Sequence, residues 1–135
     1  MTARTIDTWL RLVDTKDAAG VESILAGDVV FHSPVVDTPQ AGKAITQRYL
    51  AAAFEVFSRG DFRYVREVVG ERDAVLEFEI EIDGVSVNGV DMIRWNDEGQ
   101  ITEFKVMLRP LKALKLMHQK IAGLLQSDRP SPVDG

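Results

Sequence analysis

The sequence predicts an α+β domain in which helices cover the one apolar face of a largely antiparallel sheet. Segments with apolar residues at helical spacing lie near both ends of the chain, at 3–15, 43–58 and 110–125. Between 62 and 109, four consecutive segments alternate apolar and polar residues, as half-buried strands do. Short turn signals separate the later segments, and such turns connect antiparallel neighbours. A sheet of this kind buries one face under helices and leaves the other in water.

The N-terminal part of the chain is predicted to form two helices, a strand and a third helix. Apolar residues at helical spacing predict the first helix at 3–15, and Asp17 can cap a short second helix that Gly27 ends. The β-branched and aromatic stretch 28–33 predicts a strand, which Pro34 stops. Residues 35–42, "VVDTPQAG", predict a loop, and the third helix follows at 43–58.

Four strands and a helix make up the rest of the predicted domain. The strands are expected at 62–69, 74–83, 85–96 and 100–109. Asp83-Gly84 predicts a hairpin turn, and "NDEG" at 96–99 predicts a second turn. Pro110 opens the last helix, because its missing N–H costs nothing at a first helical position.

Composition favours one ordinary globular domain, predicted at 1–126 with a mobile tail at 127–135. There is no cysteine, which excludes disulfides and thiolate metal sites. The net charge of −5 and the scattered basic residues disfavour nucleic acid or an anionic membrane as a partner. No apolar run approaches the roughly 20 residues of a membrane-spanning helix. We therefore expect a cytoplasmic protein without a resident cofactor.

The two faces of the predicted sheet differ in chemistry. On the segment 74–83, apolar residues alternate with Glu77, Glu79 and Glu81, which are expected to pair with basic residues of the neighbouring strands. Those basic residues are Arg94, Lys105 and Arg109. This face is either a solvated surface or a polar dimer interface, for which Val90, Met92 and Met107 on the same face are suited.

Asp91 lies on the other, apolar face of its strand. In "VSVNGVDMIRW" (85–95), alternation groups this carboxylate with Val87, Ile93 and Trp95. A carboxylate in an apolar environment has a raised pKa unless it is paired or hydrogen-bonded. Asp91 is either a satisfied structural group, bonded to the Trp9 indole, the Tyr49 hydroxyl or a water, or a group that lines a cavity and meets a ligand.

Three segments resemble the nuclear-transport-factor-2-like superfamily, in its SnoaL-like (ketosteroid-isomerase-like) branch. They are "WLRLVDTKD" from Trp9, "DVVFHSPV" from Asp28 followed by Gly42 and Ile45, and "GVDMIRWNDEGQITEFKV" from Gly89. The resemblance implies a cystatin-like conical barrel: a curved sheet wrapped around helices, with an apolar pocket inside. It also implies a homodimer formed through the outer face of the sheet. The expected pocket residues are Trp9, Phe31, Ser33, Tyr49, Phe78, Trp95, Phe104 and Val106.

The same resemblance places Asp91 on a catalytic acid but leaves its usual partners missing. In ketosteroid isomerases this acid donates a hydrogen bond to an oxyanion. The position of their base holds Ser33, and the position of their oxyanion tyrosine falls near Trp9. The late-strand aspartate of limonene epoxide hydrolases and SnoaL-type cyclases corresponds to Val106. Neither serine nor valine can act as a base unaided, so whether the protein is an enzyme stays open.

His32 is the remaining candidate base. If Phe31 points inward, alternation places His32 on the opposite face, although the strand end at Pro34 could redirect it. The second histidine, His118, is expected on the surface or in helix packing, and two isolated histidines predict no metal site.

Three functions follow, in order of preference. The first is binding of an apolar small molecule (steroid, terpenoid or polyketide-like) anchored by Asp91. The second is an isomerase, dehydratase or cyclase that uses Asp91 and His32. The third is a non-catalytic interaction module whose interior is filled by side chains.

Overall fold

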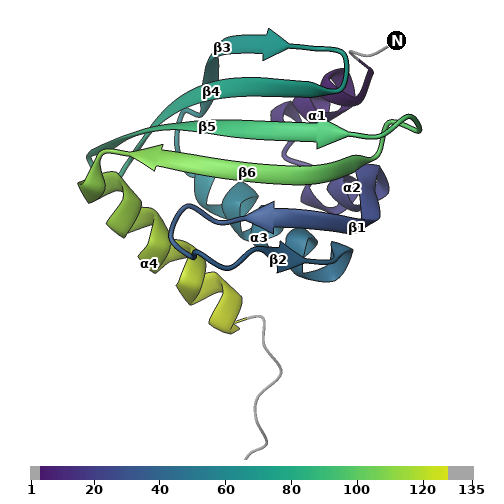
Figure 1. The fold of residues 1–135 in the computed structure, drawn as a ribbon. Helices are drawn as coiled ribbons and strands as arrows, with labels where there is room; N and C mark the ends of the chain where they lie inside the picture. The colour runs from purple at the N-terminus through teal and green to yellow at the C-terminus, as the bar shows by residue number, and fades with distance from the viewer. Residues whose placement is uncertain (1–3, 128–135) are drawn as a thin grey trace, which may run out of the picture.

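The computed structural model describes residues 4–127, so the predicted tail lies, apart from Ser127, outside the described residues. A six-stranded curved sheet, ordered β2-β1-β6-β5-β4-β3, has the helices against one face and is not closed into a full barrel (Figure 1). The helices are α1 (Arg4–Asp14), α2 (Ala18–Val21), α3 (Lys43–Phe57) and α4 (Leu111–Ser127), with a 3-10 turn η1 (Glu22–Ile24). The strands are β1 (Leu25–His32), β2 (Gln40–Ala41), β3 (Arg63–Val69), β4 (Asp73–Ile82), β5 (Val85–Trp95) and β6 (Ile101–Arg109).

The predicted fold class is confirmed, and the pairing of the strands follows the predicted turns. Strands β3 to β6 form three consecutive antiparallel pairs. The β4–β5 hairpin turns at Asp83 and Gly84, which both have positive φ, as a tight two-residue turn requires. The one parallel pair is β1 with β6, and the short β2 inside the predicted loop adds an antiparallel edge to β1.

The prediction that Gly27 ends the second helix is wrong. Asp17 does cap α2, accepting a hydrogen bond of 3.0 Å from the Gly20 N–H. The chain becomes extended already at Leu25, which pairs with Ile101 of β6, and both side chains are fully buried. Burying two large aliphatic side chains between sheet and helices stabilises the strand here, so Gly27 lies inside β1.

The core lies between the concave face of the sheet and the helices. Buried residues from α1, β1, β5 and β6 form one cluster, which includes Trp9, Ile93 and Phe104. A second cluster around Phe78 packs against α3 and α4. Helix α4 runs from the end of β6 past the β1–β2 connection and lies against α3, β5 and β6 (Figure 1).

The outer face of the sheet carries ion pairs, but not those that the sequence predicted. Glu77 and Glu79 pair with Arg66 and Arg63 of the edge strand β3. They do not pair with arginines of β5 and β6, because the register places Val90 opposite Glu77 and Asn88 opposite Glu79.

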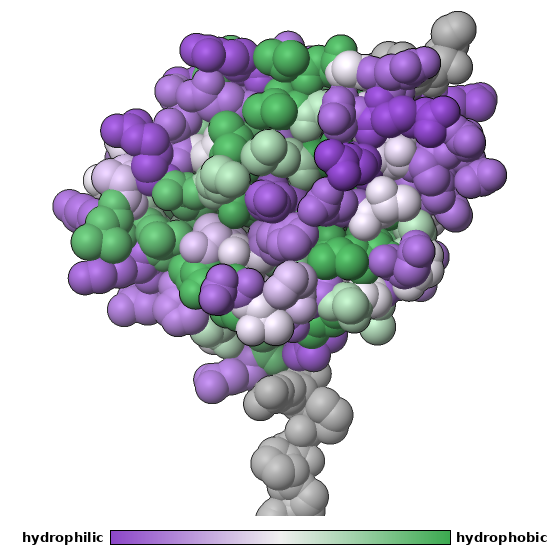
Figure 2. Space-filling model, in the orientation of Figure 1, coloured by the Kyte–Doolittle hydropathy of each residue, from purple (hydrophilic) through white to green (hydrophobic). Residues whose placement is uncertain are grey.

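Exposed apolar side chains lie among these charges. Val68, Val75 and Met92 lie directly opposite one another on the neighbouring strands β3, β4 and β5. Two residues further along the outer face of β5, Val90 lies opposite Met107 of β6. We call these five residues the outer-face patch. Figure 2, in the orientation of Figure 1, shows hydrophobic side chains interspersed with hydrophilic ones across the molecule.

Candidate functional site

A pocket of about 860 Å³ lies between the concave face of the sheet and helices α1, α3 and α4. Six of the eight predicted pocket residues line it: Trp9, Phe31, Ser33, Tyr49, Phe104 and Val106. The other two, Phe78 and Trp95, are almost completely buried in the core and are not part of the pocket wall. A volume of this order is typical of small-molecule sites, and the wall is mainly aromatic and aliphatic, as such sites are.

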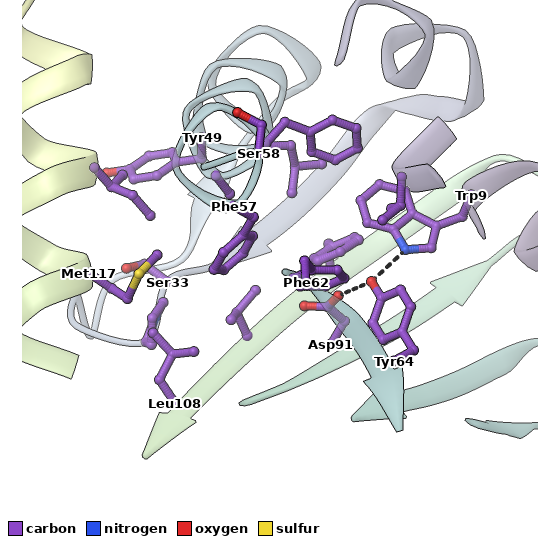
Figure 3. A pocket seen from close by; sticks show the side chains of 18 of the residues that line it. Trp9, Ser33, Tyr49, Phe57, Ser58, Phe62, Tyr64, Asp91, Leu108 and Met117 are labelled. Atoms are coloured by element: carbon purple, nitrogen blue, oxygen red, sulfur yellow. Dashed lines mark hydrogen bonds between the residues drawn. The ribbon is translucent and has the colours of Figure 1, made fainter. Parts of the chain in front are cut away.

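Asp91 lies in this wall at the end of a chain of hydrogen bonds. The Trp9 indole Nε1 donates to the Tyr64 hydroxyl over 3.0 Å, and that hydroxyl donates to Asp91 Oδ2 over 2.6 Å (Figure 3). The other carboxyl oxygen, Oδ1, has no hydrogen-bonding side chain or backbone partner among residues 4–127. Because Asp91 also lines the pocket, Oδ1 is the atom that it can offer to a ligand.

The local sequence explains how the three side chains meet. Alternation along β5 places Asp91 on the concave face together with the buried Val87, Ile93 and Trp95, as predicted. Trp9 projects from the buried stripe of α1, and its ring is held 5.0 Å from the ring of Phe104. Tyr64 of β3 lies opposite Phe78 of β4 in the register and reaches Asp91 from the far side of that strand.

Burial changes the acidity of the two oxygen groups. Asp91 is only 7% exposed, and removal from water raises its pKa from 3.8 to about 7, while the hydrogen bond from Tyr64 works in the opposite direction. The pKa of Tyr64 is well above its usual 10, chiefly because of burial and then because of the neighbouring Asp91 charge. Near neutral pH, Asp91 is therefore present both as a neutral acid and as a carboxylate, while Tyr64 stays protonated.

Tyr64 was not among the predicted site residues. The predicted structural partners of Asp91 were the Trp9 indole, the Tyr49 hydroxyl and a water, whereas Trp9 reaches the carboxyl only through Tyr64. The alternation of β3 was a weak signal, because the pairing of β3 with β4 shifts register between Tyr64 and Arg66. Its position two residues after the predicted strand start at 62, on the same face as Phe62, was the only pointer in the sequence.

The candidate base His32 lies outside the pocket, whereas His118 lies on the pocket wall. His32 is not part of the pocket wall: its Nε2 lies 2.9 Å from Glu103 Oε2 on the neighbouring strand, while Phe31 faces the pocket. Strand alternation therefore decides its direction, and the structure does not bring His32 to Asp91. His118, expected on the surface or in helix packing, is exposed and also lines the pocket from α4.

The described part of the chain contains neither a metal site nor a membrane-spanning helix. Among residues 4–127, no three histidine, aspartate or glutamate side chains are grouped so that they could hold a metal ion. Within the same range, no helix has both the length and the apolar character needed to cross a membrane.

Comparisons with known proteins agree with this architecture. The sequence model of the SnoaL-like domain matches residues 6–104, whereas no curated protein matches the sequence. Among solved structures, a steroid delta-isomerase from Pseudomonas aeruginosa has 34% sequence identity and a TM-score of 0.88, over 93% of this chain and 92% of that one. A protein with a cystatin-like fold from Silicibacter pomeroyi has 28% identity and a TM-score of 0.86, over 94% and 89% of the two chains.

More distant structures share the fold alone. A putative SnoaL-like polyketide cyclase from Jannaschia has 17% identity and a TM-score of 0.67, over 96% of each chain. The match of the domain model to most of the chain, together with the 34% identical structure, shows the family. The chain belongs to the SnoaL-like domain family.

Proposed function

We propose that this protein binds an apolar small molecule with an oxygen substituent, of the steroid, terpenoid or polyketide type, in the pocket next to Asp91. One observation carries the proposal: a buried carboxyl group has one oxygen fixed by Tyr64 and the other free at the wall of an apolar cavity. A few placed polar groups in an otherwise apolar pocket are the usual means of orienting a small ligand. The cysteine-free composition fits the expected cytoplasmic setting.

The protonation state of Asp91 decides which ligand group it can meet. With Oδ2 accepting from Tyr64, the neutral acid carries its proton on Oδ1 and donates to a ketone or another acceptor. The carboxylate instead accepts from a hydroxyl group. The half-buried rings of Tyr49, Phe54 and Phe57 supply apolar area, and each Å² removed from water contributes about 25 cal/mol.

An isomerase is the second candidate function, and the 34% identity to a steroid delta-isomerase favours it. Asp91 would donate to the developing oxyanion, but proton transfer also needs a base. The base position holds Ser33, and His32 faces Glu103 on the outside of the sheet. On this pocket wall, His118 is the histidine that could serve. A dehydratase or cyclase has the same need, so binding remains the first proposal.

The third function, an interaction module with a filled interior, has less support. A cavity of about 860 Å³ that reaches Asp91 is the opposite of a filled core. Core-filling side chains, such as Phe78, lie beside this cavity rather than within it.

The test is a thermal-shift screen of purified protein against steroid, terpenoid and polyketide ketones, with mass spectrometry of any molecule that co-purifies. A ligand at a hundredfold excess over its dissociation constant stabilises the folded state by about 2.7 kcal/mol. Asp91→Ala should reduce the shift, while Glu81→Gln, an exposed carboxylate on the outer face, should not change it. The proposal is wrong if no ketone stabilises the wild type, or if the shift is the same in Asp91→Ala.

We also propose that the protein forms a homodimer through the outer face of the sheet. The outer-face patch supports this, since Val68 is 58% exposed and Met107 is 49% exposed. Acidic and basic side chains alternate around the patch, for example in the pair Arg94–Glu103. A two-fold arrangement can therefore place acids of one copy against bases of the other.

A further inference from the structure

We propose that the pocket has a second polar subsite beside α4, made by Tyr49, Ser33 and His118, which receives an oxygen at the far end of the ligand. The ligand class is then an elongated apolar molecule with a hydrogen-bonding oxygen at each end. This inference rests on the proposed function, because the oxygen at the first end is assigned to Asp91.

The three side chains come from different elements and line the same pocket. Tyr49 projects from α3, Ser33 directly follows β1, and His118 projects from α4, and all three line the pocket. Figure 3 shows Tyr49 and Ser33 on the side of the pocket next to α4, while Asp91 and Tyr64 lie on the other side. These two groups of polar side chains therefore lie apart in the pocket, whose wall also includes charged residues such as Arg11, Asp61 and Glu67.

Each member of this second set has hydrogen-bonding capacity to spare. Ser33 Oγ accepts a bond of 3.2 Å from the Val35 N–H, which leaves its own hydroxyl proton available. Within residues 4–127, neither the Tyr49 hydroxyl nor the His118 ring has a hydrogen-bonding protein partner. The other tyrosine, Tyr64, uses its hydroxyl in two bonds, so Tyr49 is the tyrosine whose hydroxyl is left for a ligand.

The Tyr49 hydroxyl is held in place before any ligand arrives. Its ring stacks on Phe31, with ring centroids 5.0 Å apart and an angle of 23° between the planes. A ring fixed in this way loses little conformational freedom when its hydroxyl binds, which favours affinity. The subsite is thus partly preorganised.

The wall between the two polar sets favours a ligand whose central part is apolar. It is formed by apolar side chains of α3, β6 and α4, including Phe57, Leu108 and Met117. A ligand that fills this space with a hydrocarbon body and reaches only the first set would place carbon against the Tyr49 hydroxyl and remove it from water. An oxygen at that end prevents the loss. The two sets and the apolar span together favour a molecule that is polar at both ends.

Helix α4 contributes His118 and Met117 to the pocket wall. The SnoaL-like domain model ends at residue 104, whereas His118 and Met117 belong to α4, which begins at Leu111. The segment beyond the matched region therefore supplies part of the wall that the far end of the ligand meets.

The experiment compares two probes that differ only at one end: androst-4-en-3-one, with a single ketone, and testosterone, with the same ketone and a hydroxyl at the other end. Dissociation constants are measured by calorimetry for the wild type and Tyr49→Phe, which keeps the ring and its stacking. One hydrogen bond corresponds to about a threefold to tenfold preference for testosterone in the wild type. Tyr49→Phe should remove this preference by weakening testosterone binding, while androst-4-en-3-one binding should become equal or tighter, because its hydrocarbon end no longer buries a hydroxyl.

Controls separate this inference from the function on which it rests. Asp91→Asn should weaken both probes by a similar factor, and the preference for testosterone should survive in it. Ser33→Ala and His118→Ala should each reduce the preference, and circular dichroism checks that every variant is folded. Equal binding of the two probes to the wild type, or a preference that persists in Tyr49→Phe, would overturn the second subsite alone. Failure of both probes to bind the wild type would overturn the steroid form of the proposed function and the subsite that rests on it.

Discussion

Tyr64 and Asp91 share a hydrogen bond of 2.6 Å although they lie on strands that are not neighbours in the sheet. Strand β4 runs between them, and the tyrosine side chain crosses it on the concave face. Gly89 lies opposite Phe78 in the register, and the absence of a side chain there leaves room for the Phe78 ring. The contact thus joins the edge strand β3 to the centre of the sheet and holds the carboxyl group in one orientation.

Asp91 should make the protein less stable as the pH rises from about 4 to 7. The pKa of Asp91 is about 7 in the folded state and 3.8 in the unfolded chain, so the folded state binds the proton more tightly. Stability from this group is complete below pH 4 and is lost progressively up to pH 7, by roughly 4 kcal/mol at most. Urea unfolding of wild type and Asp91→Asn at pH 5, 6, 7 and 8 measures this.

The asparagine variant is the internal control for that titration. It can still accept from Tyr64, so near pH 4 its stability should lie within about 1 kcal/mol of the wild type. Above pH 7 it should be the more stable protein, because it has no buried charge. Parallel pH profiles for the two proteins would show that Asp91 does not titrate in this range.

Tyr64→Phe should destabilise the protein by about 1–3 kcal/mol, because two buried groups lose their partner. The Trp9 indole loses its acceptor and Asp91 Oδ2 loses its donor. The matched control is Tyr49→Phe, whose hydroxyl has no hydrogen-bonding protein partner within residues 4–127, and it should change stability by less than about 0.5 kcal/mol. The denaturant midpoints of the two variants measure this difference in stability. Equal losses of stability would contradict the role given to Tyr64.

Most of the fold was predictable because local sequence patterns specify most of its helices, strands and turns. The alternation of β4 and β5, the Asp83-Gly84 turn and the helical stripes each specify an element without reference to the others. The inward position of Asp91 followed from the same alternation. Gly27 was misplaced because tertiary burial of Leu25 against β6 overrides a helix-ending glycine, and burial is not a local signal.

The candidate site was less predictable because its contacts link distant segments. Tyr64 and Asp91 are 27 residues apart in the chain, and the register shift in β3 hides the face of Tyr64 from simple alternation. The direction of His32 depended on whether the strand end twists, and its contact with Glu103 is a cross-strand pair that needs the β1–β6 pairing to be known. His118 lies at the edge of the apolar face of α4, where sequence spacing does not separate solvent from pocket.

Gly89→Ala should destabilise the protein by about 1–3 kcal/mol through overpacking. A methyl group there would lie 2.5 Å from Phe78 Cζ, 2.6 Å from Leu108 Cδ2 and 2.8 Å from the Met107 carbonyl oxygen. The last is a backbone atom of the neighbouring strand and cannot move aside without distorting the pair. Gly27→Ala, where no atom lies within 4 Å, is the control and should not lower the thermal midpoint. Similar losses in both variants would instead indicate a general effect of replacing strand glycines.

The proposed dimer predicts that a charge in the outer-face patch separates the subunits. Met92→Glu should convert a dimer to a monomer in sedimentation at micromolar concentration, because the unpaired carboxylate would be buried in the interface. Leu111→Glu, also at an exposed apolar residue but at the start of α4, should remain dimeric. A monomeric wild type at 100 µM, or dissociation by both variants, would contradict the proposed interface.

Ketone affinity should fall above pH 7 if Asp91 binds the ketone as a neutral acid. Only the protonated form can donate from Oδ1, since Oδ2 is occupied by the Tyr64 hydroxyl. With a pKa of about 7 in the free protein, the dissociation constant should be constant at low pH and rise by up to tenfold per pH unit above 7. Binding of an alcohol, which donates to the carboxylate, should follow the opposite trend.

Titrations of androst-4-en-3-one at pH 5 to 9 measure the first trend, with Asp91→Asn as the variant whose affinity should not depend on pH. A ketone affinity that is constant to pH 9 in the wild type would mean that the ligand does not meet the acid proton, and the polar anchor would then have to be sought elsewhere on the pocket wall.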